Sequence, residues 1–166
     1  EERLLTLLAG RERRLEKARE PIRDRYDLIL IDCPPALNIL TVNALTAADS
    51  VLIPMQCEYY ALEGLSGLVG TIEQIRDSVN PKLQIEGILR TMFDPRNNLS
   101  NDVSAQLIEH FGDRVFRTII PRNVRLGEAP SHGLPVMLYD PKSRGADAYA
   151  TLARELRERL TPAPVV

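Results

Sequence analysis

The sequence has few of the residues on which several classes of protein depend. It contains no tryptophan, and its three phenylalanines and five tyrosines are scattered along 166 residues. Single-stranded nucleic acids stack on rows of aromatic side chains, so this composition argues against such a platform. The two cysteines, Cys33 and Cys57, stand beside apolar runs without the close spacing of a zinc or redox site. We therefore interpret them as reduced structural thiols.

Features of secreted and membrane proteins are also missing. No apolar run approaches the roughly 20 residues that cross a bilayer, and the N-terminus lacks the pattern of a signal peptide. The 21 Lys and Arg residues against 23 Asp and Glu residues give a formal net charge of −2. The overall charge therefore gives no argument for nucleic-acid binding, and only a local basic patch would support it. With 44% hydrophobic and 27% charged residues, we expect a soluble cytoplasmic protein with no membrane partner.

The chain lacks an initiating methionine and a phosphate-binding loop. Position 1 is Glu, and none of the three lysines, Lys17, Lys82 and Lys142, follows a glycine, so the G-x-x-x-x-G-K-[ST] motif is absent. We interpret the sequence as a fragment of a longer protein. Residues 1–160 show no repeat or linker and are expected to form a single partial domain, whereas the Pro-containing, uncharged residues 161–166 are expected to be a disordered tail.

Apolar residues alternate between continuous runs and helical spacing. The continuous runs, typical of buried parallel strands, cover residues 28–32, 50–54, 83–92 and 115–120. Helical spacing covers residues 11–22, 37–48, 62–75, 103–111 and 143–160, with Gly112 at a C-cap position. In the last helix, we expect the charged residues, Glu155 among them, to form a solvated face. The alternation predicts an α/β fold: a doubly wound, mostly parallel sheet with helices on both faces.

Ligands of such sheets bind outside the carboxyl ends of the strands, which directs attention to Asp32. It closes the run Leu28-Ile29-Leu30-Ile31, where a carboxylate would be held at the edge of the sheet. This is the arrangement of a Walker B aspartate, which orients the water shell of a nucleotide-bound Mg²⁺. An aspartate that begins a turn before two prolines would give the same pattern, so these residues alone leave both interpretations open.

Longer strings of residues identify a family. The segments Tyr26–Pro35, Asn43–Ser50, Gln56–Leu65 and Ile120–Gly133, in this order, closely resemble the ParA/Soj family of chromosome- and plasmid-partitioning ATPases. The resemblance covers nearly the whole chain and corresponds to about the C-terminal two thirds of such a protein. Family members carry a deviant Walker A loop near the N-terminus, which this chain does not contain. The resemblance implies a P-loop NTPase fold with that portion absent.

The resemblance assigns nucleotide-binding roles where residues match. It implies that Asp32 acts on the Mg²⁺ shell through water and that Pro121, Arg122 and Asn123 lie against the adenine of ATP or ADP. The full-length parent would be an ATP hydrolase, while this chain has no catalytic residue and is expected to be inactive alone. The apolar helix 37–48 would face an ATP-dependent homodimer interface, although a buried core helix predicts the same pattern.

The resemblance also implies partners. Family members bind double-stranded DNA without sequence preference once ATP has dimerised them, and Arg96 and Arg125 occupy the matching positions; exposed arginines are also common as plain surface charges. A centromere-binding protein of the ParB type would stimulate hydrolysis, and the protein would associate with the nucleoid. Leu134 replaces a lysine frequent in the family, which removes one positive charge nearby. A non-hydrolysing adaptor, or a relative that positions cargo or division sites, is the alternative function.

Overall fold

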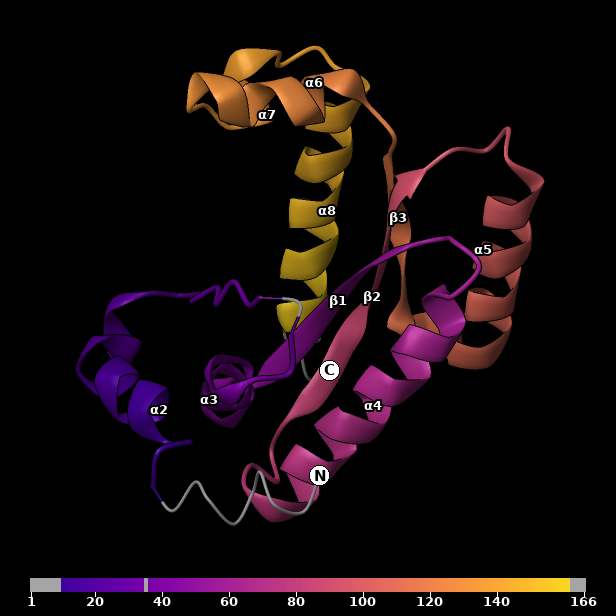
Figure 1. Ribbon diagram of the computed structural model, residues 1–166. Helices are drawn as coiled ribbons and strands as arrows, with labels where there is room; N and C mark the ends of the chain where they lie inside the picture. The colour runs from indigo at the N-terminus through magenta and orange to yellow at the C-terminus, as the bar shows by residue number, and fades with distance from the viewer. Residues whose placement is uncertain (1–9, 35, 162–166) are drawn as a thin grey trace, which may run out of the picture. The chain divides into compact units, whose positions relative to one another are not determined.

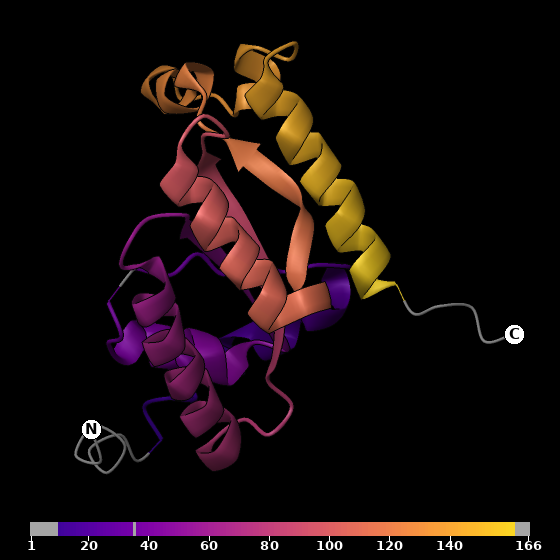
Figure 2. The same cartoon turned by 90° about the vertical axis from the view of Figure 1, so that its right-hand side faces the viewer.

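The computed structural model describes residues 10–34 and 36–161, which Figures 1 and 2 draw as a coloured ribbon. These residues divide into two compact units, the first with residues 10–34, 36–51 and 65–86 and the second with residues 52–64 and 87–161. Within the described ranges, no helix is both long and apolar enough to cross a membrane. The prediction of a single domain over 1–160 stays a prediction.

Three of the predicted strands are present and form one sheet. Strands β1 (Ser50–Gln56), β2 (Gln84–Phe93) and β3 (Val115–Pro121) are hydrogen-bonded in the order β1-β2-β3. Strands β2 and β3 run parallel, with Ile88 opposite Val115 and Phe93 opposite Pro121. The fold is therefore of the α/β class with a parallel sheet, as predicted.

Two long helices cover the sheet in the second unit. Helix α5 (Asn98–Phe111) connects β2 to β3, and α8 (Arg144–Leu160) lies on the other side of these strands (Figure 1). The side chains of Leu89, Phe116 and Ile120 form the core, against which Leu152 and Leu156 of α8 pack. Because the free energy falls when apolar side chains leave water, the apolar face of α8 holds this helix on the sheet.

Local sequence signals set the ends of these helices. Asn97 and Ser143 are the N-caps of α5 and α8, and their side-chain oxygens accept backbone N–H bonds from Leu99 and Ala146. Gly112 follows α5 with φ of 51°, a conformation that glycine adopts at little cost. The predicted C-cap is confirmed.

Short helices follow β3 in the second unit. They are α6 (Val124–Glu128), the 3₁₀ helix η3 (Ala129–His132) and α7 (Val136–Tyr139), while the 3₁₀ helix η2 (Gly112–Arg114) precedes β3. Gly133 ends η3 in the left-handed conformation, with φ of 64°. These short elements place the segment 122–140 at the carboxyl end of β3.

The first unit is built around two apolar helices. Helix α3 (Ile39–Ala47) is buried along residues 41–47, and α4 (Ala61–Ser78) buries Ile72 and Ile75. This burial agrees with a core helix at residues 41–47, while Leu37 and Leu40 are exposed and the dimer interface predicted for 37–48 stays a prediction. Helix α2 (Arg14–Arg19) packs beside α3 and continues as the 3₁₀ helix η1 (Glu20–Arg25). The change of helix type coincides with Pro21, which has no N–H for the α-helical pattern.

The predicted strand at residues 28–32 is wrong. These residues have no regular secondary structure, and Leu28 and Leu30 are 50% and 79% exposed. An extended apolar segment becomes a strand only when a neighbouring strand accepts and donates its backbone hydrogen bonds. None of the three strands described here pairs with it.

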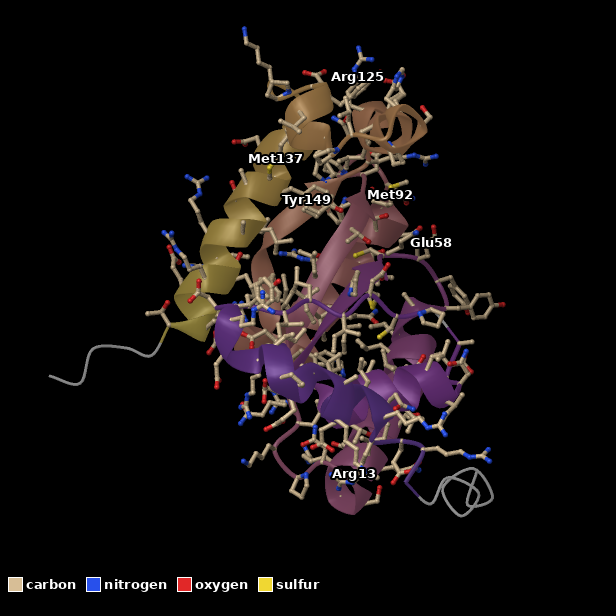
Figure 3. All side chains as sticks on the ribbon, turned by 90° about the vertical axis from the view of Figure 1, so that its left-hand side faces the viewer. Arg13, Glu58, Met92, Arg125, Met137 and Tyr149 are labelled. Carbon is tan, nitrogen blue, oxygen red and sulfur yellow. The ribbon has the colours of Figure 1, made fainter. Side chains whose placement is uncertain are left out.

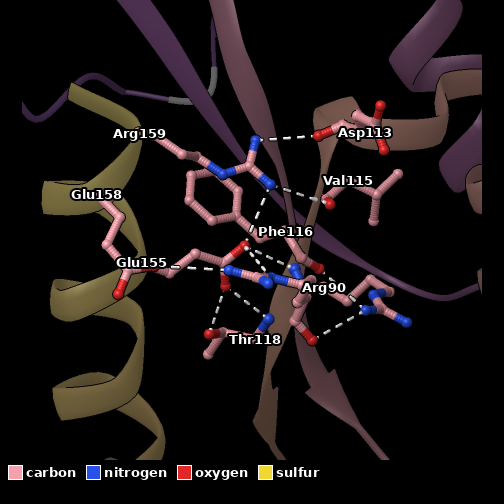
Figure 4. A network of polar contacts seen from close by, with 9 residues as sticks. Arg90, Asp113, Val115, Phe116, Thr118, Glu155, Glu158 and Arg159 are labelled. Carbon is pink, nitrogen blue, oxygen red and sulfur yellow. Dashed lines mark hydrogen bonds and ion pairs between the residues drawn. The ribbon is translucent and has the colours of Figure 1, made fainter. Parts of the chain in front are cut away.

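The predicted solvated face of α8 is wrong at Glu155. Its side chain is only 6% exposed and accepts hydrogen bonds from the backbone N–H groups of Arg117 and Thr118, both at 2.8 Å (Figure 4). The Thr118 hydroxyl donates at 2.6 Å and Arg159 at 3.1 Å. These partners lie mostly on β3, far away in the sequence, which is why helical charge periodicity alone does not indicate the burial of Glu155.

Candidate functional site

Asp32 belongs to the first unit and lies on its surface. The residue is exposed in the irregular segment that precedes α3, and within residues 10–34 and 36–161 its carboxylate takes part in no ion pair. A carboxylate of this kind suits Mg²⁺, which prefers oxygen ligands and retains several waters. No group of three or more ligating side chains that could hold a metal occurs among the described residues.

The segment Pro121–Asn123 belongs to the second unit, at the carboxyl end of β3. The Arg122 N–H donates to the Phe93 carbonyl at 3.0 Å, which fixes this segment to the end of β2. The side-chain oxygen of Asn123 accepts the Arg125 N–H at 2.9 Å and caps α6. This oxygen therefore already accepts one hydrogen bond within the fold and has a second lone pair left.

An open hollow of about 430 Å³ adjoins Pro121. Phe93, Pro95 and Ile119 give it apolar walls, and Arg144 and Asp147 of α8 add charge. A flat heterocycle needs apolar faces and a few polar groups at its rim, and the hollow offers both.

The end of β2 contains a feature that sequence reasoning missed. Met92 has φ of 51°, the one positive value found outside glycine among the described residues. The register of β2 against β3 shifts between Arg90 and Phe93, so an irregularity of the β-bulge type accompanies this strain. The irregularity sets Phe93 opposite Pro121 at the strand ends. A methionine carries no sequence signal for such a conformation.

Arg96, one of the two predicted DNA contacts, is exposed but held by a carboxylate. Its Nε and terminal nitrogen donate to the two oxygens of Asp94 at 2.9 and 2.8 Å, and its backbone N–H donates to Asp94 at 3.0 Å. The hydrogen bonds from Arg96 lower the pKa of Asp94 to about 2. The side chain of Arg96 is nevertheless 88% exposed, so an external phosphate can reach it.

Arg125, the other predicted contact, is paired in the same manner. It donates to Glu128 at 2.7 Å and lies 3.3 Å from Asp140, and Glu128 also accepts from the Tyr139 hydroxyl at 3.2 Å. The Arg125 hydrogen bond is the main cause that lowers the pKa of Glu128. Figure 3 shows Arg125 and Met92 toward the same end of the second unit. Both arginines thus lie beyond strand ends, and a phosphate group must compete with their carboxylates.

Comparison with known proteins connects these residues to a family. A model described as an AAA domain matches residues 1–85. The sporulation initiation inhibitor protein Soj of Bacillus subtilis is 57% identical over 147 residues, which cover 89% of this chain and 58% of that protein. The chromosome partitioning protein ParA of Caulobacter vibrioides is 56% identical over 153 residues, which cover 91% of this chain and 57% of that protein.

A solved structure extends the comparison. The cobyrinic acid a,c-diamide synthase of Mycobacterium smegmatis, with bound ATP analog and magnesium, is 35% identical. The match has a TM-score of 0.74 and covers 92% of this chain and 56% of that one. The chain therefore spans less than three fifths of the length of each of these proteins.

Proposed function

The chain belongs to the ParA/Soj family of partitioning ATPases and to the AAA-domain family that matches its first half, and from this premise we propose that it is part of an ATP hydrolase for chromosome or plasmid partitioning. The observation that carries the proposal is the identity of more than half the residues over about nine tenths of the chain. The exposed arginines at the strand ends and the exposed carboxylate of Asp32, which forms no ion pair within the described part of the chain, are consistent with it.

The proposed nucleotide-contacting residues are Asp32 and the segment Pro121–Asn123. Asp32 holds a water of the Mg²⁺ shell, and Pro121 offers an apolar face to the adenine beside Arg122 and Asn123. When bound, Mg²⁺ neutralises charge on the phosphates during transfer to water. The chain itself contains no phosphate-binding loop, so we propose that it does not hydrolyse ATP alone and that the longer protein does.

The proposed DNA interaction depends on two copies of the protein. A chain with a net charge of −2 gains little from long-range attraction to DNA. An ATP-bound homodimer presents Arg96 and Arg125 twice, so the number of phosphate contacts doubles and the linked sites bind more tightly. A centromere-binding protein of the ParB type then stimulates hydrolysis and releases the nucleoid-bound dimer.

DNA binding by single-arginine variants tests this function. Binding of the full-length protein to duplex DNA is measured with ATP across a salt series, for wild type, Arg96→Gln and Arg125→Gln. Each variant should reduce the slope of log affinity against log salt by about 2 per dimer, because one phosphate contact per protomer is lost. Arg114→Gln is the control, since Arg114 is exposed and forms no ion pair within the described part of the chain. Unchanged slopes in both variants would contradict the proposed DNA contacts.

ATP hydrolysis by an Asp32 variant tests the nucleotide site. Asp32→Asn in the full-length protein should abolish most Mg²⁺-dependent hydrolysis, because the amide holds the hydrated ion less well than a carboxylate. Hydrolysis at the wild-type rate would refute the role of Asp32. A full-length protein that neither hydrolyses ATP nor responds to it in DNA binding would instead favour the non-hydrolysing adaptor.

A further inference from the structure

The segment 11–25 in the first unit concentrates positive charge. It contains seven Lys and Arg residues and four Asp and Glu residues, whereas the rest of the chain contains 14 basic and 19 acidic residues. It consists of a turn, helix α2 and the 3₁₀ helix η1. The segment therefore carries three more positive than negative charges, whereas the remaining residues taken together are net acidic.

Two of these seven basic side chains bind other residues of the first unit. Arg13 donates to the Val79 carbonyl at 3.0 Å and pairs with Glu16 at 2.9 Å. Arg19, whose side chain is only 15% exposed, lies 3.5 Å from Asp49. These contacts attach the segment to the first unit and explain why these two arginines are present.

The other five cations have no such structural role. They are exposed and take part in no ion pair within residues 10–34 and 36–161: Arg11, Arg14, Lys17, Arg23 and Arg25. Each leaves its full charge available to an external anion, in contrast to Arg96 and Arg125, which are both paired with carboxylates.

The backbone that carries these cations is anchored. The side-chain oxygen of buried Asn43 accepts the N–H groups of Arg14 and Leu15 at 3.1 and 3.2 Å. These bonds satisfy two of the free donors at the start of α2, whose own N-cap residue provides no side-chain bond. Asn43 also donates to the Ile39 carbonyl at 2.9 Å, so its orientation is fixed. Asn43 of α3 therefore holds the start of α2, the helix that carries Arg14 and Lys17, in place.

We propose that the segment 11–25 is a second DNA-contacting surface, which binds the phosphate backbone of double-stranded DNA through Arg11, Arg14, Lys17, Arg23 and Arg25. This inference rests on the proposed function of DNA binding and adds a surface that the strand-end arginines do not include. The α2 and η1 helices together extend about 20 Å, a length that faces about six phosphates of one DNA strand. Four of the five cations lie on these two helices, and Arg11 lies in the turn that precedes them, so their charge is opposite to that of such a row.

Other anionic partners fit the segment less well. It contains no aromatic residue on which unpaired bases could stack, which disfavours single-stranded nucleic acid. Its α-helix has only six residues, and Ile22, the exposed large apolar side chain within 11–25, is 37% exposed. A membrane-binding helix needs a broad apolar face that enters the lipid, which this segment does not offer.

Two variants of equal charge test the surface. In the full-length protein, Arg14→Gln, Lys17→Gln, Arg23→Gln and Arg25→Gln are combined into a surface variant. A control variant combines Lys82→Gln, Arg114→Gln, Arg154→Gln and Arg157→Gln, all exposed positions elsewhere. Both lose the same charge, so a long-range effect lowers affinity equally and only direct contact distinguishes them. Binding to a 40-base-pair duplex is measured with ATP across a salt series.

The surface variant should bind at least about tenfold more weakly than the control at 0.15 M salt. Its salt slope should be lower by about 7 per dimer, because four contacts per protomer are lost and each removes about 0.9. A charge-conserving variant, Arg14→Lys with Arg23→Lys and Arg25→Lys, should bind as wild type does, and circular dichroism checks that all variants fold.

Each other outcome overturns the inference in a recognisable way. If wild type binds DNA with ATP but the surface and control variants behave alike, the second surface is refuted and the proposed function stands. If wild type shows no ATP-dependent DNA binding, both fail together. If the surface variant keeps DNA binding but loses binding to phosphatidylserine vesicles, the segment is a lipid surface and the inference is wrong.

Discussion

The buried carboxylate of Glu155 gives the most quantitative test of how the second unit is held together. It accepts two backbone N–H bonds at 2.8 Å, one hydroxyl bond at 2.6 Å and one bond from Arg159 at 3.1 Å. Burial opposes the charge, but these bonds outweigh it and lower the pKa of Glu155 from 4.5 to about 2. A folded-state pKa about 2.5 units lower corresponds to about 3 kcal/mol of stability at neutral pH.

The sign of the pH dependence follows from this lowered pKa. Above about pH 5 the side chain is charged in both the folded and the unfolded protein, so its contribution to stability is complete. As the pH falls, the unfolded chain binds the proton first, and the contribution drops to about 1.4 kcal/mol at pH 3 and disappears below pH 2. Glu155→Gln should therefore destabilise the protein by about 3 kcal/mol at pH 7 and by less than half of this at pH 3.

Urea unfolding of wild type and Glu155→Gln at pH 7, 5, 4 and 3 measures this difference directly. Glu158→Gln is a matched control, because Glu158 is one turn of α8 away by sequence, 68% exposed and 3.5 Å from Arg117. An exposed pair of this kind contributes little, and the control should stay within about 0.5 kcal/mol of wild type. A loss from Glu155→Gln below about 1 kcal/mol, or one that does not change with pH, would mean that the carboxylate of Glu155 does not stabilise the second unit through its charge.

Three further changes test other contacts. Gly87→Ala places a Cβ 2.7 Å from a carbonyl oxygen and 2.7 Å from an aromatic ring, so urea unfolding should show a loss of about 2 kcal/mol; Gly64→Ala meets nothing within 4 Å and should cost nothing or gain up to about 1 kcal/mol. Asp94→Asn weakens the pairing that holds Arg96 and should tighten DNA binding several-fold in a titration, but not when Arg96→Gln is also present. Asn43→Ala leaves two N–H groups of α2 without their acceptor and should lower stability by about 1–2 kcal/mol, with faster hydrogen exchange at those amides.

The strands and long helices were predictable because their information is local. The runs at 83–92 and 115–120 contain apolar residues continuous enough for a buried strand, and Gly112 marks the end of α5 by its own conformational preference. The apolar run at 28–32 is a case in which local composition predicts the wrong secondary structure. Its composition favours a strand, but a strand also needs a hydrogen-bonding neighbour, which composition cannot supply.

Among the site residues, too, local contacts can be predicted from the sequence and distant contacts cannot. The positions of Arg96 and Arg125 beyond strand ends follow from the strand assignments. Their pairing with Asp94 and Glu128 was present in the sequence, at separations of two and three residues, and could have been found from that spacing. The burial of Glu155 depends on β3, far away along the chain, and no local pattern indicates it.

Binding of the full-length wild-type protein to duplex DNA of random sequence, measured with ATP, with ADP and without nucleotide across a salt series, decides whether ATP controls its attachment to DNA. We expect tight binding with ATP alone, with affinity that falls steeply and linearly with salt on logarithmic axes, because phosphate contacts release counterions. Binding that is indifferent to nucleotide, or that does not weaken with salt, would contradict this expectation.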